Sequence, residues 1–253
     1  MTSNPIAVST WSVHHLLETI RLEELPSELA LRGYGRVEIC HFHLTSQEPS
    51  YLRAIGTLFR KSGIIIQTLL IDDGDITNIS TRDKDLAWIS AWIESAAHLG
   101  AENARVIGGK APISEASLKL SVDGLKHCAA LGVKVGVRVV TENWFETLST
   151  PEAVHHVLDA VGSNLGFLAD TGNWHGATKY SDLQSIFARA ELCHAKTSFS
   201  AGQVLDEDDN GQWLKAAQRA KYSGPYTLIF ADAGDEWDGL KIERDFILRH
   251  SLI

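Results

Sequence analysis

The chain has 253 residues, of which 44% are hydrophobic and 22% charged, values that are ordinary for a folded globular protein. This composition excludes a disordered tail, a collagen-like fibre and a small disulfide scaffold, and no apolar run approaches the roughly 18 to 20 residues that cross a bilayer. Its 23 basic and 32 acidic side chains leave a net charge of −9, which argues against a nucleic-acid partner because nucleic-acid binders need a surplus of Lys and Arg.

Apolar and β-branched runs that are typical of buried strands recur at intervals of roughly 30 residues. Eight such runs are present, and they span residues 6–11, 37–42, 64–71, 104–107, 133–140, 165–169, 192–196 and 226–231. The segments between them have the spacing of amphipathic helices, as residues 85–99 show with apolar side chains three and four positions apart. Glycine adopts the left-handed conformation of a helix C-cap most easily, and we expect helices to end at Gly33, Gly63, Gly100, Gly132 and Gly162.

Eight strand–helix units within about 250 residues are what a (β/α)8 barrel, or TIM barrel, requires. Neither a linker nor the Gly-x-Gly-x-x-Gly turn of a doubly wound sheet is present in the sequence. We therefore predict an α/β fold that consists of a single TIM-barrel domain over residues 1–253.

Polar residues collect where the predicted strands end, which is where TIM barrels carry their chemistry. They are His14, His15, His41, His43, Asp72, Asp73, Asp75, Lys110, Glu142, Asn143, Glu146, Asp170, Asn173, His175, His194, Lys196, Asp232 and Asp235. Tryptophans at the same ends can stack on a sugar ring, and these are Trp11, Trp144 and Trp174. We expect residues 72–75 to form a solvated turn and the acidic residues 206–209 to form an exposed loop.

Several short motifs occur in an order and at a spacing that match one superfamily. They are Val8-Ser9-Thr10-Trp11-Ser12, the second-strand entry at 33–39, the fourth-strand segment at 99–109, Thr141-Glu142-Asn143, Asp170-Thr171-Gly172-Asn173 and Cys193-His194-Ala195-Lys196. Together they cover nearly the whole chain. With them the sequence resembles the xylose isomerase-like TIM barrels, also described as the sugar phosphate isomerase/epimerase or endonuclease-IV-like superfamily.

The resemblance implies a divalent metal (Mn, Mg, Co or Zn) held by Glu, Asp, His and Glu at the ends of the fifth to eighth strands. Glu142, Asp170 and His194 match the first three positions, and two carboxylates with one imidazole suit these ions. Relatives then have Gly-Pro-x-x-x-Glu, whereas this chain has Ile229 at the last position, so it lacks a ligand that is commonly also a general base. Asp232 lies three residues further on and is expected to reach back as a substitute. Thr197 also departs from the pattern, because relatives often have Asp after the lysine of the seventh strand.

The expected roles of the other residues follow from their positions. We expect Glu142, Lys196 and Asp232 to be catalytic, and the substrate to be bound by Trp11, His41, His43, Arg105, Asn143 and His175. By strand alternation His41 and His43 share one face with each other, and together with Glu38 they are expected to line the cavity. Lys196 either binds a substrate oxygen, stabilises an enolate or neutralises the metal-binding carboxylates. Structural roles stay open for the predicted ligands: a helix cap or arginine partner for Glu142, a turn for Asp170 and a buried core position for His194.

The leading interpretation is a metal-assisted isomerase or epimerase that acts on a small sugar or sugar-phosphate-like carbonyl compound through an enediolate. A lyase or dehydratase that eliminates a β-oxygen from a keto-sugar or keto-cyclitol is the alternative, and it tolerates Ile229 better because it needs one base and one acid. A second alternative is a metal-free binding barrel whose site has eroded at Ile229. A DNA-repair endonuclease is disfavoured by the charge of −9 and the missing carboxylate.

The cysteines and the N-terminus predict where the protein acts. Cys40, Cys128 and Cys193 are odd in number, far apart and in apolar surroundings, which favours reduced thiols. Residues 1–5 lack the basic start and apolar stretch of a secretory signal. We therefore expect a cytoplasmic protein with a small sugar-like substrate, no nucleic-acid partner and no membrane association. A homo-oligomer stays open, because members of the superfamily often form dimers or tetramers.

Overall fold

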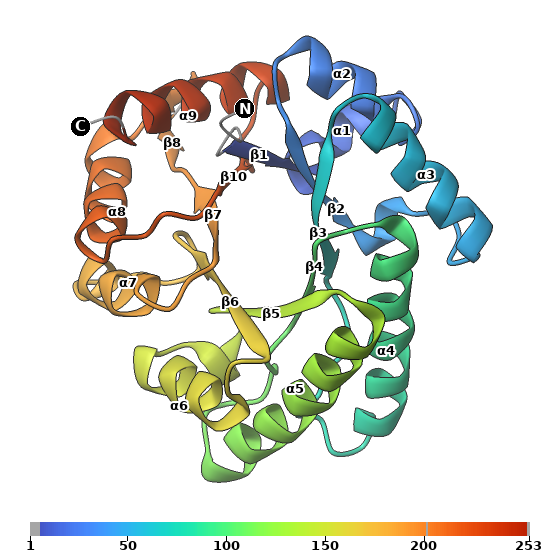
Figure 1. The fold of residues 1–253 in the computed structure, drawn as a ribbon. Helices are drawn as coiled ribbons and strands as arrows, with labels where there is room; N and C mark the ends of the chain where they lie inside the picture. The colour runs from blue at the N-terminus through green and yellow to red at the C-terminus, as the bar shows by residue number, and fades with distance from the viewer. Residues whose placement is uncertain (1–5, 201, 252–253) are drawn as a thin grey trace.

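Eight parallel strands close into a barrel in the computed structural model, which describes residues 6–200 and 202–251 (Figure 1). The strands are β1 (Ile6–Ser9), β2 (Arg36–Cys40), β3 (Ile65–Ile71), β4 (Asn103–Val106), β5 (Arg138–Glu142), β6 (Leu165–Asp170), β7 (Leu192–Lys196) and β10 (Tyr226–Ile229). Each strand pairs in parallel with its neighbours around the ring, and β10 pairs with β1 to complete it. The predicted TIM barrel is confirmed. The segment 1–5, on which the expectation about a secretory signal rests, lies outside the described residues.

Helices surround the barrel on its outside (Figure 1). They are α1 (His14–Leu17), α2 (Leu25–Leu31), α3 (Pro49–Lys61), α4 (Arg82–Leu99), α5 (Glu115–Val135), α6 (Pro151–Val161), α7 (Lys179–Phe187), α8 (Glu207–Arg219) and α9 (Glu236–Ser251). Short 3-10 turns follow β1, β2 and β5, namely η1 (Thr10–Val13), η2 (His41–His43) and η3 (Glu146–Leu148), and β7 is followed by an antiparallel hairpin of β8 (Phe199–Ser200) and β9 (Val204–Leu205). Within the described part of the chain, no helix is both long and apolar enough to cross a membrane.

The fifth strand begins later than its apolar pattern predicts, because the helix before it continues further. Residues 133–135, predicted as strand, belong to α5, which ends on Gly136 with a left-handed φ of 79°. Gly132, predicted as the helix end, is instead a contact position, since a Cβ there would lie 2.6 Å from the carbonyl oxygen of Val137. The predicted strand start at 133 and the predicted helix end at Gly132 were both wrong. Gly132 allows α5 to pack closely on the start of β5, and the helix continues past it.

Two predicted strands end early, in 3-10 turns. Residues 10–11 belong to η1, and His41 begins η2 directly after Cys40. The hydroxyl of Thr10 joins these two exits, because it accepts the amide of Cys40 at 2.9 Å and lies 2.9 Å from Nδ1 of His43. The expectation that His41 and His43 share a strand face was therefore wrong, since the chain has left the sheet before either residue.

The sequence predicts an exposed loop at the acidic segment 206–209, but these residues belong to the start of α8. The carboxylate of Asp206 accepts two backbone amides in the first turn of α8, at 3.1 and 3.0 Å, and so caps that helix. Oδ1 of Asp209 accepts hydrogen bonds from Nζ of Lys179 and from the hydroxyl of Tyr180, both at 2.7 Å. These acidic side chains cap one helix and join α7 to α8.

The packing of α3 against α4 depends on Gly56, where a Cβ would lie 2.0 Å from the carbonyl oxygen of Leu99. We expect Gly56→Ala to lower the free energy of unfolding by about 1 to 3 kcal/mol, because backbone has to move to admit the methyl group. The matched control is Gly211→Ala in α8, where nothing lies within 4 Å of the added Cβ. That change should raise stability by about 0.5 to 1 kcal/mol through helix propensity. Urea denaturation of both variants tests this pair, and effects of the same sign would contradict the close α3–α4 contact.

Candidate active site

Three residues, called the triad below, lie on neighbouring strands: Glu142 and Asp170 end β5 and β6, and His194 lies within β7. Their side chains meet inside the mouth of the barrel. Nδ1 of His194 lies 3.6 Å from Oε1 of Glu142 and 3.6 Å from Oδ2 of Asp170. All three residues are buried, and one ligand atom from each lies within 4.8 Å of the other two. Two positions earlier on each strand, the side chains form a buried apolar cluster of Val140, Leu168 and Leu192. The structure thus brings the three predicted ligands to one point, and their binding of a metal stays a prediction.

A buried carboxylate on β2 holds His194 from the other side. Oε2 of Glu38 lies 2.7 Å from Nε2 of His194, while its Oε1 accepts hydrogen bonds from Gln67 at 3.0 Å and Thr68 at 2.9 Å. Gln67 also donates to Thr227 on β10, so this network crosses the inside of the barrel. Nε2–H of His194 donates the hydrogen bond to Glu38, and Nδ1 is the nitrogen that faces the rest of the triad.

The pairing shifts the pKa values of both groups. Burial raises the pKa of Glu38, but the charge of His194 and hydrogen bonds from three side chains outweigh burial and lower this pKa below its usual range. Burial lowers the pKa of His194, but Glu38 and then Glu142 outweigh it and raise this pKa well above its usual range. His194 is therefore an imidazolium at neutral pH as long as no cation competes for Nδ1.

Arg105 on β4 is buried beside the triad and offsets part of its negative charge. Its Nε lies 3.1 Å from Oε2 of Glu142 without the angle of a hydrogen bond, its Nη2 pairs with Asp72, and its guanidinium carbon lies 5.0 Å from the ring centroid of Trp144. Burial lowers the pKa of Arg105, but Asp72 and Glu142 raise it, so the guanidinium stays charged. The expectation that Asp72 lies in a solvated turn was wrong, because its partner comes from a strand 33 residues further along the chain.

A cavity of about 520 Å³ opens in front of the triad, which is within the usual size range of small-ligand pockets. Of the predicted catalytic and substrate-binding residues, the cavity is lined by Trp11, His41, Arg105, Glu142 and Lys196. Burial lowers the pKa of His41, and its Nδ1 accepts the amide of Asp72 at 3.2 Å, so this ring is neutral. The cavity therefore combines aromatic faces, one neutral imidazole and fixed charges of both signs.

The remaining predicted residues do not line this cavity, and they are His43, Asn143, His175 and Asp232. Asn143 instead joins the ends of β5 and β6, because its Nδ2 donates to the carbonyl of Asp170 at 3.0 Å and its Oδ1 accepts the amide of that residue at 2.7 Å. His43 lies beside Thr10, where burial lowers its pKa to about 4. His175 and Asp232 are exposed.

The position that the resemblance reserves for a fourth ligand is apolar. β10 pairs with β7 so that Ile229 lies beside Lys196, and both side chains line the cavity. Asp232 lies beyond the end of β10, exposed to solvent. Burial raises the pKa of Glu243 on α9, and the charge of Asp232 raises it further. The structure therefore does not bring Asp232 to the triad as the sequence had suggested.

The triad fits a divalent metal. Ligands that share one ion at about 2.0 to 2.4 Å lie about 3 to 4 Å apart, and Nδ1 of His194 is 3.6 Å from each carboxylate. Asn173 donates to Oε1 of Glu142 at 2.9 Å, and the amide of Gly172 donates to Oδ1 of Asp170 at 2.7 Å, so both carboxylates are oriented. Oε2 of Glu142 is buried without a hydrogen-bond partner among the described residues, which leaves an acceptor for a cation or a proton.

The profile of one protein family, described as Xylose isomerase-like TIM barrel, matches residues 27–248. Because this match covers most of the sequence, the chain belongs to the xylose isomerase-like TIM barrel family. The resemblance drawn from the short motifs is thereby confirmed. No curated protein matches the chain.

Solved structures share the fold at low sequence identity. D-allulose 3-epimerase from Methylomonas sp. is 15% identical with a TM-score of 0.75, and 98% of each chain is covered. The probable 3-DHS dehydratase involved in petrobactin synthesis from Bacillus anthracis is 16% identical with a TM-score of 0.75, over 97% of this chain and 99% of that one. A xylose isomerase-like TIM barrel protein from Mycobacterium smegmatis, in complex with magnesium, is 14% identical with a TM-score of 0.73, over 98% and 96% of the two chains. At these identities the neighbours establish the fold and leave the activity to be argued from the site.

Binding of a metal to the triad should release a proton. Because the pKa of His194 is raised well above its usual range, Mn²⁺ must displace the proton on Nδ1 at neutral pH. We expect about one proton per ion and an affinity that falls about tenfold for each unit of decreasing pH. Calorimetry in buffers of different ionisation enthalpy measures this release. Glu38→Gln removes the carboxylate that raises the pKa of His194, so equal proton release by variant and wild type would contradict the role of Glu38.

The apolar fourth position should weaken the metal site. We expect Ile229→Glu to tighten Mn²⁺ binding by at least about tenfold, because it adds an anionic ligand from a side chain that already faces the cavity. Asp232→Asn should leave the affinity unchanged, since Asp232 is exposed outside the cavity. Calorimetric titration of the three proteins tests both statements. Loss of Mn²⁺ in Asp232→Asn alone would show that Asp232 is the fourth ligand, and binding by none of the three would favour the metal-free barrel.

Proposed function

We propose that the chain is a divalent-metal-assisted isomerase or epimerase that acts on a small sugar or sugar-phosphate-like carbonyl compound through an enediolate. The observation that carries this proposal is the buried triad facing a cavity of about 520 Å³. Family membership and the fold shared with D-allulose 3-epimerase support it. Glu142, Asp170 and His194 would hold the ion (Mn, Mg, Co or Zn), which supplies Lewis-acid stabilisation of charge on neighbouring substrate oxygens.

Residues of the cavity wall would orient the substrate and stabilise the negative charge that develops on its oxygen atoms. The faces of Trp11 and Trp144 suit the C–H surface of a sugar ring. The side chain of Lys196 extends over Gly172, where an added Cβ would lie 2.6 Å from Cδ of Lys196. Lys196 forms no ion pair with residues 6–200 or 202–251. Its ammonium group is therefore available for a substrate oxygen or for the developing enolate charge.

Glu142 is the base that we assign to proton removal from the carbon next to the carbonyl. Its Oε2 has no hydrogen-bond partner in the described part of the chain, and the guanidinium of Arg105 lies beside it. The hydrogen bond from Asn173 to Oε1 keeps the carboxylate turned toward the cavity.

Ile229 favours a second candidate, a lyase or dehydratase that eliminates a β-oxygen from a keto-sugar or keto-cyclitol. Moving a proton between two faces of a carbon takes an acid–base group on each face, whereas elimination takes one base and one acid. At the position where the pattern has a second carboxylate, the cavity presents the aliphatic side chain of Ile229. The dehydratase from Bacillus anthracis has the same fold, which is compatible with this alternative.

Deuterium exchange tests the proposed function. With Mn²⁺ and a panel of ketoses in D₂O, we expect the wild type to introduce solvent deuterium next to the carbonyl. Glu142→Gln should slow this exchange at least about 100-fold because it removes the base. The control Glu146→Gln changes an exposed carboxylate four residues further on, in η3, and should leave exchange intact.

The product distinguishes the two candidates. A deuterated isomer or epimer supports the isomerase, whereas loss of water to an unsaturated carbonyl compound supports the lyase. Full exchange by a folded Glu142→Gln variant would exclude Glu142 as the base.

A further inference from the structure

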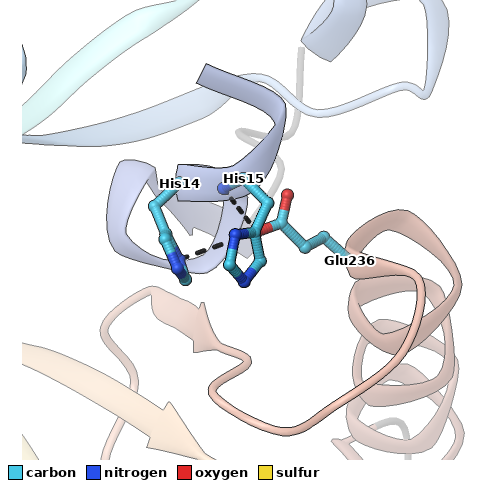
Figure 2. Close-up of side chains that lie close together, drawn as sticks. All are labelled: His14, His15 and Glu236. Carbon is cyan, nitrogen blue, oxygen red and sulfur yellow. Dashed lines mark hydrogen bonds and ion pairs between the residues drawn. The ribbon is translucent and has the colours of Figure 1, made fainter. Parts of the chain in front are cut away.

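A second cluster of metal-ligating side chains lies at the same end of the barrel, outside the cavity. His14 and His15 begin α1, Glu236 begins α9, and one ligand atom from each lies within 4.8 Å of the other two. None of the three lines the cavity described above. Figure 2 shows the carboxylate of Glu236, from α9, joined by dashed lines to the ring of His14 and to the backbone amide of His15 on α1. We infer that these three residues form a surface site for a divalent transition metal such as Zn²⁺ or Ni²⁺, and we call it the rim site.

The rim site is oriented by hydrogen bonds that leave its ligand atoms usable. The amides of His15 and Leu16 donate to Oε1 and Oε2 of Glu236 at 2.9 and 3.0 Å, and the side chain of Glu236 is only 11% exposed. Each carboxylate oxygen can accept more than one bond, so capacity for an ion remains. Nδ1 of His14 donates to the carbonyl of Trp11 at 3.0 Å, so the lone pair that an ion would bind lies on Nε2 of that ring. These contacts already restrict the side chains of His14 and Glu236, so ordering those two side chains costs a bound ion less affinity.

The ligand set of the rim site shifts the preference among ions relative to the triad, although Zn²⁺ suits both. Two imidazoles and one carboxylate favour Zn²⁺, Ni²⁺ or Cu²⁺ over Mg²⁺ and Mn²⁺, because the heavier ions bind nitrogen more strongly. Glu236 forms no ion pair with a Lys or Arg of the described residues, so its charge is not neutralised by one. The side chains of His14 and His15 are 44% and 69% exposed, which gives an ion from solution access and leaves positions for water.

The position of the rim site suggests what a bound ion does. The ring closes where β1 pairs with β10, and α1 and α9 follow these two strands. An ion at the rim site would thus tie the first strand–helix unit to the last across the closing seam. Trp11, which lines the cavity, lies three residues before His14 and is hydrogen-bonded to it. The same ion would restrict the aromatic wall of the cavity.

Calorimetric titration with Zn²⁺ tests the rim site. We expect one Zn²⁺ site to weaken at least about tenfold in His15→Ala and in Glu236→Gln, since even groups that only orient a ligand contribute that much. That site should persist in Glu142→Gln, which perturbs the triad. The matched control is His156→Ala, which removes one of another adjacent histidine pair, on α6, that belongs to no such cluster among the described residues. It should bind Zn²⁺ as the wild type does.

A second measurement does not depend on how the variants fold. In the wild type, Zn²⁺ should shift the ring proton signals of His14 and His15 in the NMR spectrum and leave those of His155 in place. Unchanged Zn²⁺ affinity in both folded rim variants, or the absence of shifts at His14 and His15, would overturn the rim site. Either result would leave the proposed function of the triad unaffected, because the two sites share no residue.

Discussion

The hydrogen bond between Glu38 on β2 and His194 on β7 spans the inside of the barrel, and the site depends on it. Both side chains are buried, and a buried charge without a partner is strongly destabilising. Each of the two is therefore tolerated because the other is present. The pair also fixes the imidazole so that Nδ1 faces Glu142 and Asp170. One interaction thus allows a polar barrel interior and sets the geometry of the triad.

The charges around this pair are compatible with a bound divalent cation. Asp73 also lines the cavity, but it is exposed and its charge is offset by Lys110. Apart from that pair, the described carboxylates of the barrel interior and cavity are those of Glu38, Asp72, Glu142 and Asp170. Three cationic groups oppose them, namely Arg105, Lys196 and protonated His194. Four negative charges against three positive ones leave one in excess. A divalent ion that replaces the proton of His194 makes the two sides equal. The interior is therefore closer to electrical balance with such an ion than without it.

The fold could be predicted from the sequence because each strand is an apolar run of its own, and parallel strands in a closed ring leave few alternative orders. The predictions were wrong at positions where a contact with a residue far away in the sequence determines the local structure. Gly132 resembles a helix cap locally, and its true role depends on the approach of β5. Asp72 resembles a turn residue, and its partner Arg105 comes from another strand. Neither partner is visible in a local pattern.

In the candidate site, too, residues placed by their strand could be predicted, and residues placed by long-range contacts could not. Glu142, Asp170 and His194 could be placed together because each lies at or near the carboxyl end of a barrel strand, and these ends share one rim. Asp232 could not be placed in this way, since it lies past the end of β10 and the path of the following loop decides where it points. Glu38 was expected on the cavity wall, but its link to His194 joins residues 156 positions apart. The charge of Glu38 within an apolar run was the available signal.

The environment behind Lys196 explains how this cation stays effective. Thr197 follows it where the resemblance leads one to expect Asp, and the hydroxyl of Thr197 donates to Oε1 of Glu243 on α9. Burial raises the pKa of Glu243 well above its usual range, so this carboxyl group is neutral at neutral pH. Neither residue then places a negative charge behind Lys196. Its positive charge acts on the cavity, where the proposed chemistry develops negative charge on oxygen. The replacement of Asp by Thr at position 197 and the burial of Glu243 are thus parts of one electrostatic arrangement.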